Sequence, residues 1–279
     1  MKETRNITSV LFYIIMTLLA VFFIFPIALV VMNSFKNKLY ISTTPFAFPD
    51  AESYVNIKNY VDGLAKIHFL SSIGYSVFIT VVSVVLIVLF CSMTSWMISR
   101  VKGKLSSSLY YLFIISMVIP FQMVMYTMTK VANTLHLDNF VGICVLYLGF
   151  GAGMAVFMFC GFISGIPIEL EEASLIDGCN PLQTFFKIVL PVMKPITITV
   201  GILNAMWIWN DFLLPSLMLG LNGKIKTLPV AVQAFVGSYV KQWDLILSAA
   251  LLAIVPMIVV FLIGQKQIMK GMVEGAVKG

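Results

Sequence analysis

Charged side chains gather in one short segment of an otherwise apolar chain. We call residues 165–195 the acidic loop; it holds Glu169, Glu171, Glu172, Asp177, Lys187 and Lys194. Exposed carboxylates at this density can bind basic side chains of another protein through charge-assisted hydrogen bonds. The alternative is an amphipathic hairpin lying on the lipid surface. The alternative is weaker, because the polar faces of surface helices are rich in Lys and Arg and this one is acidic.

The backbone of the acidic loop is predicted to form two short helices. Pro167 suits the first turn of a helix, where its missing N–H costs nothing. The three Glu residues then lie near the positive end of the helix dipole. Gly178 is expected to end this first helix, because it accepts a left-handed backbone.

Asn180 and Pro181 are expected to begin the second helix, as N-cap and first helical residue. An apolar stripe with helical spacing follows, made of Leu182, Phe185, Phe186 and Val189. Pro191 and Pro195 should end the segment. Two short helices joined at a glycine hinge make a compact knob that could enter a groove on a partner protein.

Composition places the remainder of the chain in a membrane. Of 279 residues, 60% are hydrophobic and only 11% are charged, whereas about 25% are charged in a soluble domain. Mean hydropathy is +0.99. The net charge of +6 is spread thinly, so nucleic acid binding has no footprint. The four Cys and two His are scattered singly, so neither a disulfide framework nor a metal site is expected.

Hydropathy predicts an all-α polytopic membrane protein with six transmembrane helices in a single domain, residues 1–279. Each predicted span is long enough to cross a hydrocarbon core of about 30 Å. The spans cover residues 10–32, 69–99, 109–128, 140–164, 195–219 (interrupted by Asp211) and 245–265. The first is too long for a signal-peptide core and lacks a cleavage site, so it should remain as an anchor.

Lys and Arg residues predict the orientation of the spans. They are only slightly more numerous on the side of the N-terminus, but Arg100, Lys102 and Lys104 are concentrated in one very short loop on that side. Short loops rich in Lys and Arg stay in the cytoplasm. We therefore expect a multi-pass protein of the cell membrane, with the acidic loop and both termini in the cytoplasm.

Two spans carry features beyond apolarity. The fourth contains Gly149-x-x-x-Gly153 and Gly161-x-x-x-Gly165, which either permit a close helix approach or reflect the general tolerance of membrane helices for glycine. The fifth contains polar and aromatic residues at depth: Asn204, Trp207, Trp209, Asn210 and Asp211. They could line a wet pathway in which Trp stacks on sugar rings, or form an interfacial aromatic belt. Gln122, with Tyr126, is a weaker second set whose alternative role is hydrogen bonding between helices.

The motifs together resemble a known family. Glu172, Ala173, Ser174, Gly178, Ile188, Leu190 and Pro191 have the spacing of the EAA loop of ATP-binding-cassette (ABC) import permeases. Residues 209–215 resemble the fifth-span signature of maltose-type carbohydrate importers, and the tail, 264–279, resembles the C-terminal tail of the second permease subunit in those systems. Ser174 departs from the family pattern, since it stands where the second Ala is usual.

The resemblance implies one subunit of a heteromeric sugar importer in a bacterial plasma membrane. The implied partners are a homologous permease, two cytoplasmic ATPase subunits that bind ATP and Mg, and an extracellular solute-binding protein that delivers the sugar. Glu172 and Asp177 would meet basic groups of an ATPase, and Gln265, Lys266, Gly275 and Lys278 of the tail would also contact the ATPases. The outer loop, residues 220–243, would enter the binding protein. No phosphate-cradling Gly-rich motif occurs in this chain, so it is expected to have no cofactor, no metal and no catalytic residue.

Other classes explain less of the sequence. An ion-coupled secondary transporter would have Asp211 alone as its coupling carboxylate and would leave the acidic loop unexplained. An intramembrane enzyme would need paired catalytic groups at depth, and no such set occurs. The nearest alternative is an ABC permease for glycerol phosphate or another polyol, but a phosphate favours an intramembrane Arg or Lys, and the six predicted spans contain neither.

Overall fold

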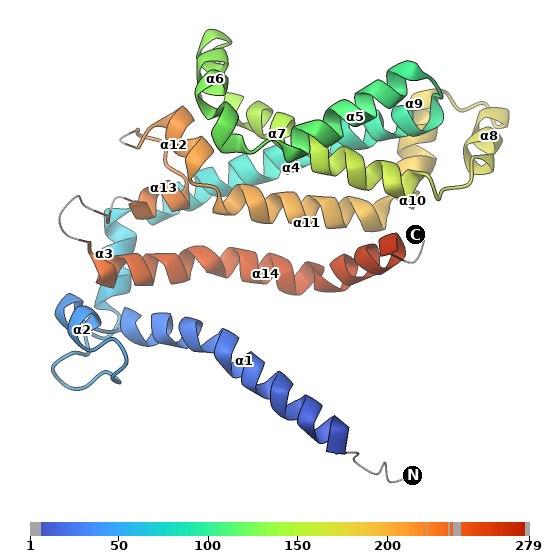
Figure 1. Cartoon of the computed structure of the whole chain (residues 1–279). Helices are drawn as coiled ribbons and strands as arrows, with labels where there is room; N and C mark the ends of the chain where they lie inside the picture. Colours follow the sequence, from blue (N-terminus) through green and yellow to red (C-terminus); the bar gives the residue numbers. More distant parts are fainter. Residues whose placement is uncertain (1–6, 222, 234, 237–240, 277–279) are drawn as a thin grey trace. The chain divides into compact units, whose positions relative to one another are not determined.

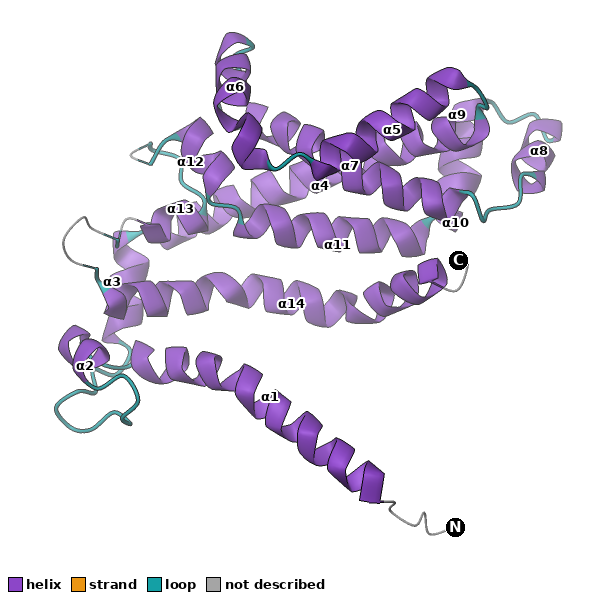
Figure 2. Cartoon of the chain, in the orientation of Figure 1, coloured by secondary structure: helices purple, strands orange, loops and turns teal. Residues whose placement is uncertain are grey.

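The structure, a computed structural model, describes residues 7–276 except 222, 234 and 237–240. In this part of the chain every extended regular element is a helix (Figure 2). The helices are α1 (Ile7–Ser34), α2 (Lys38–Thr43), α3 (Lys58–Lys66), α4 (Phe69–Arg100), α5 (Lys104–Val118), α6 (Phe121–Thr134), α7 (Gly142–Ile163), α8 (Glu169–Ile176), α9 (Pro181–Thr184), the π-helix η1 (Phe185–Val189), α10 (Leu190–Val192), α11 (Lys194–Asn210), α12 (Leu213–Leu219), α13 (Leu228–Gln233) and α14 (Trp243–Ala276). The predicted all-α class is confirmed.

The chain forms two compact units. Unit 1 comprises residues 1–69 and 232–255, and unit 2 comprises residues 70–231 and 256–279. Unit 2 holds the main apolar core, in which α7 packs against α5 and α11. Within this unit, α8 lies at one end of the bundle and α12 at the other (Figure 1).

Membrane-spanning helices match the predicted spans in number when broken helices are included. Among the described residues, four uninterrupted helices are long and apolar enough to cross a membrane: Ser9–Ser34, Phe69–Arg100, Gly142–Ile163 and Trp243–Gln265. Two bent helix pairs raise the number to six if each pair is one span. The apolar side chains of the first of these helices are exposed along most of its length, as a lipid environment permits.

The predicted span 109–128 is not one continuous helix. It is broken at Ile119–Pro120, and the flanking helices α5 and α6 are bent by 108°. Pro120 has no N–H to continue the helix. It also forces the residue before it into extended backbone, and Ile119 has ψ of 115°. The predicted span 195–219 is interrupted at Asp211 as expected, between α11 and α12.

Glycines on α7 allow close packing on two faces, but not in the predicted pattern. A Cβ at Gly153 would lie 2.8 Å from the carbonyl oxygen of Phe113 on α5, so this glycine does permit a close approach. A Cβ at Gly149 or Gly161 would meet nothing within 4 Å. The second close contact is instead at Gly151, where a Cβ would lie 2.8 Å from Oδ1 of Asn204 on α11. The pattern Gly149-x-x-x-Gly153 therefore marks only one of the two packing positions.

Unit 1 contains an ordered segment between α1 and α4. Lys36 is only 1% exposed. Its ammonium group donates hydrogen bonds to the carbonyl oxygen of Ala47 and, at 2.9 Å, to that of Thr44. Burial lowers the pKa of Lys36, and the charge of nearby Asp50 opposes this shift. Asn59 ties the segment back to α1 by donating to the carbonyl oxygens of Ser34 and Lys36, both at 2.8 Å.

Candidate functional site

The backbone of the acidic loop has the predicted hinge. α8 ends at its C-cap Asp177, and Gly178 follows with φ of +83°. Asn180 caps α9: its Oδ1 accepts the Gln183 N–H at 2.9 Å, and Gln183 Oε1 accepts the Asn180 N–H at 2.9 Å. This reciprocal capping box satisfies two donors at the helix start. The loop therefore has a fixed geometry between two capped helices.

The residues predicted to couple to an ATPase differ in exposure. Glu172, Ala173, Asp177, Gly178 and Pro191 are exposed, whereas Ile188 and Leu190 are half-buried. Large apolar side chains are exposed beside them: Ile168, Leu170, Leu175, Ile176, Leu182 and Phe186. The exposed surface of the loop thus combines carboxylates with apolar groups, a combination suited to binding another protein.

Ser174 is different, because its side chain lies inside the loop. It is 5% exposed. Its hydroxyl donates to the carbonyl oxygen of Glu171 at 2.8 Å and lies 2.8 Å from the Thr184 hydroxyl. This pair of hydroxyls joins α8 to α9. The small hydroxyl residue thus contributes to the internal packing of the loop rather than to its exposed surface.

The second half of the loop ends between the two prolines that predicted its end. The helical path continues through Pro191 to Val192, and α11 begins at Lys194 after a bend of 78°. Just before Pro191 the backbone widens into η1, in which the Leu190 N–H donates to the Phe185 carbonyl oxygen five residues earlier. A π-turn of this kind changes the local spacing of backbone groups, and we infer that it makes room for the proline ring. The segment thus ends between Pro191 and Pro195 as predicted, although Pro191 itself lies in the last turn of the helical path.

The predicted apolar stripe in this half is divided between two surroundings. Phe185 is fully buried and Val189 is 1% exposed, whereas Leu182 is 58% and Phe186 47% exposed. The buried pair packs the loop against the helices of unit 2, where the Phe185 ring lies 5.5 Å from the Trp96 ring of α4. The exposed pair remains free to contact a partner.

Glu171, which is not among the predicted coupling residues, joins the acidic loop to α4 through both of its carboxylate oxygens. Its Oε1 accepts Arg100 Nε–H at 2.8 Å, and its Oε2 accepts Trp96 Nε1–H at 2.8 Å. Arg100 Nη2 also donates to the Ile166 carbonyl oxygen at 3.0 Å. Arg100 and Trp96 are four residues apart and so share a face of α4. The relevant sequence signal was Ser174, a small residue three positions after Glu171 and therefore on the same inward face of α8.

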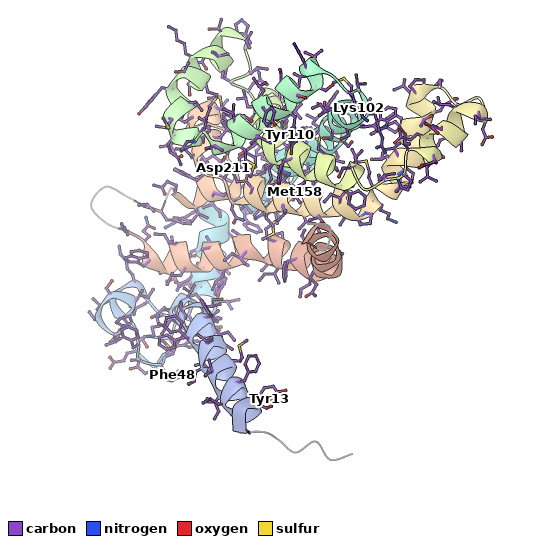
Figure 3. All side chains as sticks on the ribbon, turned by 45° about the vertical axis from the view of Figure 1, so that its right-hand side comes forward. Tyr13, Phe48, Lys102, Tyr110, Met158 and Asp211 are labelled. Carbon is purple, nitrogen blue, oxygen red and sulfur yellow. The ribbon has the colours of Figure 1, made fainter. Side chains whose placement is uncertain are left out.

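At the other end of α11, the side chain of Asp211 holds the helix break (Figure 3). Its Oδ1 accepts the Leu213 N–H at 2.9 Å, which begins α12. Its Oδ2 accepts the hydroxyl of Tyr147 on α7 at 2.9 Å. The Trp207 ring stands perpendicular to the Tyr147 ring, with centroids 5.5 Å apart. Three elements thus converge on one carboxylate, and Trp207, which is 41% exposed, leaves part of its ring accessible.

The other predicted pathway residues do not join this cluster. Asn204 is fully buried, and its Nδ2 donates to the Val200 carbonyl oxygen at 2.9 Å. Trp209 is 5% exposed. Asn210 is exposed and donates to the Met206 carbonyl oxygen of its own helix. Gln122 is exposed on α6. Of the predicted set, the structure brings together Trp207 and Asp211, and it adds Tyr147.

The tail and the outer loop are described in part. α14 continues as a helix to Ala276, and Gln265 donates to the Leu262 carbonyl oxygen at 3.1 Å. Lys266 and Gly275 belong to this helix, and Lys278 lies outside the described residues. In the outer loop, α13 is helical, and residues 222, 234 and 237–240 lie outside the described part.

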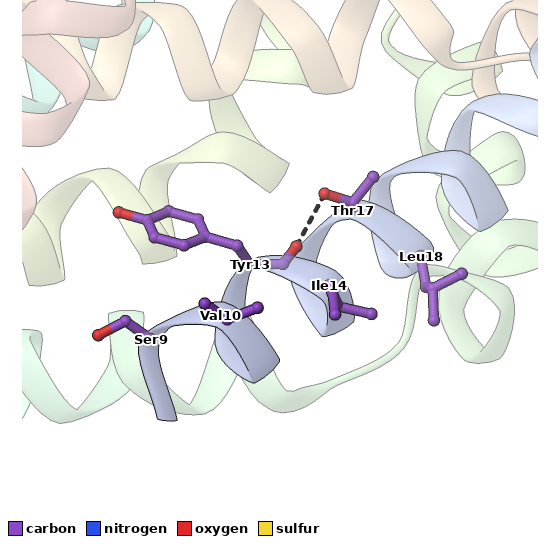
Figure 4. A pocket seen from close by; sticks show the side chains of 6 residues that line it. All are labelled: Ser9, Val10, Tyr13, Ile14, Thr17 and Leu18. Carbon is purple, nitrogen blue, oxygen red and sulfur yellow. Dashed lines mark hydrogen bonds between the residues drawn. The ribbon is translucent and has the colours of Figure 1, made fainter. Parts of the chain in front are cut away.

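A shallow hollow of about 360 Å³ on α1 is not a built site. Figure 4 shows that its lining comes from one helix, with Tyr13, Ile14 and Leu18 among the residues. The Thr17 hydroxyl is already bonded to the Tyr13 carbonyl oxygen at 2.8 Å. The polar groups here therefore do not converge on a ligand.

The geometry defines a class of protein. Several apolar helices span the membrane, an exposed acidic loop lies at one end of α11, and a polar helix break lies at the other. α11 has 17 residues, so the two features are separated by about 25 Å. Such a molecule is a polytopic helical membrane protein with an exposed acidic loop at one end of a spanning helix.

The comparisons with known proteins identify the family. Residues 67–273 match the family described as the binding-protein-dependent transport system inner membrane component, and the chain belongs to it. The chain is 36% identical over 260 residues to the probable starch degradation products transport system permease protein of Thermoanaerobacterium thermosulfurigenes, covering 93% of each chain. It is 33% identical over 282 residues to the multiple sugar-binding transport system permease protein of Streptococcus mutans, covering 100% of each.

A solved structure has the same fold. It is the crystal structure of a bacterial ABC transporter involved in the import of the acidic polysaccharide alginate. A chain of that transporter matches with a TM-score of 0.74 at 18% identity, covering 95% of this chain and 98% of that one. The chain therefore has the fold of an ABC importer permease.

Proposed function

We propose that this chain is a permease subunit of an ABC importer for sugars, with oligosaccharides as the substrate class. The family membership carries the importer assignment. The substrate class is supported by the names of two full-length relatives, which refer to starch degradation products and to multiple sugars. The predicted spans contain no Lys or Arg that would bind a phosphate, which favours an uncharged sugar over glycerol phosphate.

The proposed assembly has four kinds of subunit. A homologous permease completes the pathway, two cytoplasmic ATPases bind the acidic loop, and an extracellular binding protein delivers the sugar. Exposed Glu172, in the middle of α8, and Asp177, its C-cap residue, are the proposed ATPase contacts. In this assembly the acidic loop and both termini lie in the cytoplasm, in agreement with the Lys and Arg cluster that follows α4.

A sugar is proposed to pass the helix break at Asp211. The exposed part of the Trp207 ring offers an apolar face on which the C–H groups of a sugar ring can stack. Asp211 and the Tyr147 hydroxyl lie beside it and can exchange their mutual hydrogen bond for bonds to sugar hydroxyls. The proposed pathway also includes four residues outside this cluster, because they are polar or lie near it in the sequence: Asn204, Trp209, Asn210 and Gln122.

The test is transport by the reconstituted complex. Proteoliposomes containing this chain, its partner permease and the ATPase should take up labelled maltooligosaccharides only when ATP and the binding protein are supplied. The lone chain should neither hydrolyse ATP nor respond to a proton or sodium gradient. Ion-driven uptake by the lone chain would overturn the proposal and support a secondary transporter.

A second experiment tests the pathway. Trp207→Ala should raise the sugar concentration needed for half-maximal uptake about fivefold or more, because the sugar ring then has no aromatic face on which to stack. Phe157→Ala, which removes a similarly exposed aromatic of α7, should leave it unchanged. Equal uptake curves for both variants would remove Trp207 from the pathway.

A further inference from the structure

Glu171 connects the acidic loop directly to α4, a helix that is not its neighbour in sequence. The loop is joined by the chain to α7 on one side and to α11 on the other. The Glu171 carboxylate adds a third attachment, because both of its oxygens accept hydrogen bonds from the last turns of α4. The carboxylate is sheltered, since the side-chain exposures of Arg100 and Glu171 are 18% and 9%.

The contacts around Glu171 form one continuous set. Arg100 Nε donates to Glu171 Oε1, and Nη2 lies 2.8 Å from the same oxygen while donating to the Ile166 carbonyl oxygen, so Arg100 holds the loop at two positions. Trp96 donates to Glu171 and also places its ring against Phe185 of η1. The first and second halves of the loop are therefore both held by the same two residues of α4.

Neighbouring charges do not share this arrangement. Glu169 and Glu172, in the same turn as Glu171, are exposed, as are Lys102 and Lys104 after Arg100. Only Arg has a planar fork that can serve a carboxylate and a carbonyl at once. The charged residues here thus fall into two groups. The Arg100–Glu171 pair points inward and holds the loop, whereas the exposed Glu and Lys side chains remain available to a partner.

We propose that Glu171, Arg100 and Trp96 form the joint that transmits movement of the acidic loop to α4. This proposal rests on the proposed function, since the loop must be moved by an ATPase. A loop held only by its chain connections could tilt without displacing α4. With the joint in place, α4 moves when the loop moves. Because α4 has 32 residues, it is about 48 Å long and can carry the displacement from the loop to its opposite end. Glu171 is a positioning residue that does not itself touch the sugar.

The experiment measures the ratio of sugar imported to ATP hydrolysed in the reconstituted complex. Glu171→Gln removes the charge and one acceptor while keeping the shape. We expect normal assembly and ATP hydrolysis, with a ratio at least fivefold lower than that of the parent. The matched variant Glu169→Gln makes the same change at an exposed position of the same helix and should leave the ratio unchanged. An unchanged ratio for Glu171→Gln would overturn the proposal.

Further variants keep the test decisive if Glu171→Gln fails to assemble. Trp96→Phe removes only the indole N–H and keeps the ring against Phe185, so it should lower the ratio less than Glu171→Gln. Because both changes act on the hydrogen bonds of the same side chain, their combined effect should be smaller than the product of the two. Arg100→Lys should lower the ratio, since one ammonium cannot reproduce the two contacts. Parent-like ratios for both Trp96→Phe and Arg100→Lys would overturn the joint, whereas absence of ATP-driven uptake by the parent would overturn the proposed function instead.

Discussion

Gly178 offers the sharpest test of the acidic loop's shape. Its φ of +83° lies in the region that costs an ordinary residue about 1–2 kcal/mol. A Cβ at Gly178 would meet nothing within 4 Å, so no collision adds to this backbone cost. Gly178→Val should therefore destabilise the loop by about 2 kcal/mol, the upper end of this range, because Val is β-branched. Gly178→Asn should cost much less, because Asn adopts the left-handed region more readily than other residues.

The consequence can be measured as binding of the ATPase. If the ATPase recognises only the hinged loop, a cost of 1–2 kcal/mol lowers its apparent affinity about 5- to 30-fold. Titration of labelled ATPase onto the permease in nanodiscs would report this change, and sugar uptake by the same complexes would report its functional effect. Membrane insertion should be normal, because the spans do not depend on Gly178. Equal affinities for the Val and Asn variants would refute the reasoning from backbone strain.

Three further predictions concern other parts of the chain. Gly153→Val should lower the stability of the detergent-solubilised protein by about 1–3 kcal/mol through overpacking against α5, whereas Gly149→Val should change its melting temperature little; similar shifts would contradict the packing. Lys36→Met leaves two carbonyls without their donor, which costs about 1–3 kcal/mol, so proteolysis within residues 37–66 should become at least fivefold faster, and Lys38→Met serves as the exposed control. Glu172→Lys should weaken ATPase binding more than Glu172→Ala, since it adds repulsion to a lost contact of about 1.5–3 kcal/mol; a charge reversal in the ATPase should partly restore it, and parent-like binding by both variants would exclude the contact.

Local backbone rules predicted the acidic loop well. Gly178 and Asn180 have conformations set by their own chemistry, one by the absence of a side chain and the other by an amide that caps the following helix. Neither requires knowledge of distant residues. The same holds for the number of spans, which follows from the length of apolar runs.

Features that depend on tertiary packing could not be read in this way. Glu171 and Glu172 are adjacent residues of the same type, yet one is buried and the other exposed. Which of them faces inward depends on where α4 lies, and hydropathy does not locate α4 relative to α8. Tyr147 was missed for the same reason: it is a residue of α7 whose partner, Asp211, is 64 positions further along the chain.

Prolines mark both places where a helical path bends sharply. Pro120 follows the break in a predicted span, and Pro191 and Pro195 flank the bend of 78° that ends the acidic loop. The two breaks differ in the preceding backbone. Ile119 is extended, so the chain turns directly at Pro120, whereas the π-turn before Pro191 lets the helix run on to Val192 before it ends. A proline identifies a place where the helix must change, but its neighbours decide at which residue the break falls.

The arrangement of polar groups gives α11 a particular part in the proposed mechanism. Its N-terminal end is joined to the acidic loop and its C-terminal end to the break at Asp211, and between them its side chains pack on α7. Close-packed helices transmit displacement because their interfaces resist compression. A movement of the loop would therefore reach Asp211 along α11, while Tyr147, on α7, would follow only as far as the two helices move together. Relative sliding of α7 and α11 would separate the Tyr147 hydroxyl from the Asp211 carboxylate, and both groups would then be free to bind sugar hydroxyls.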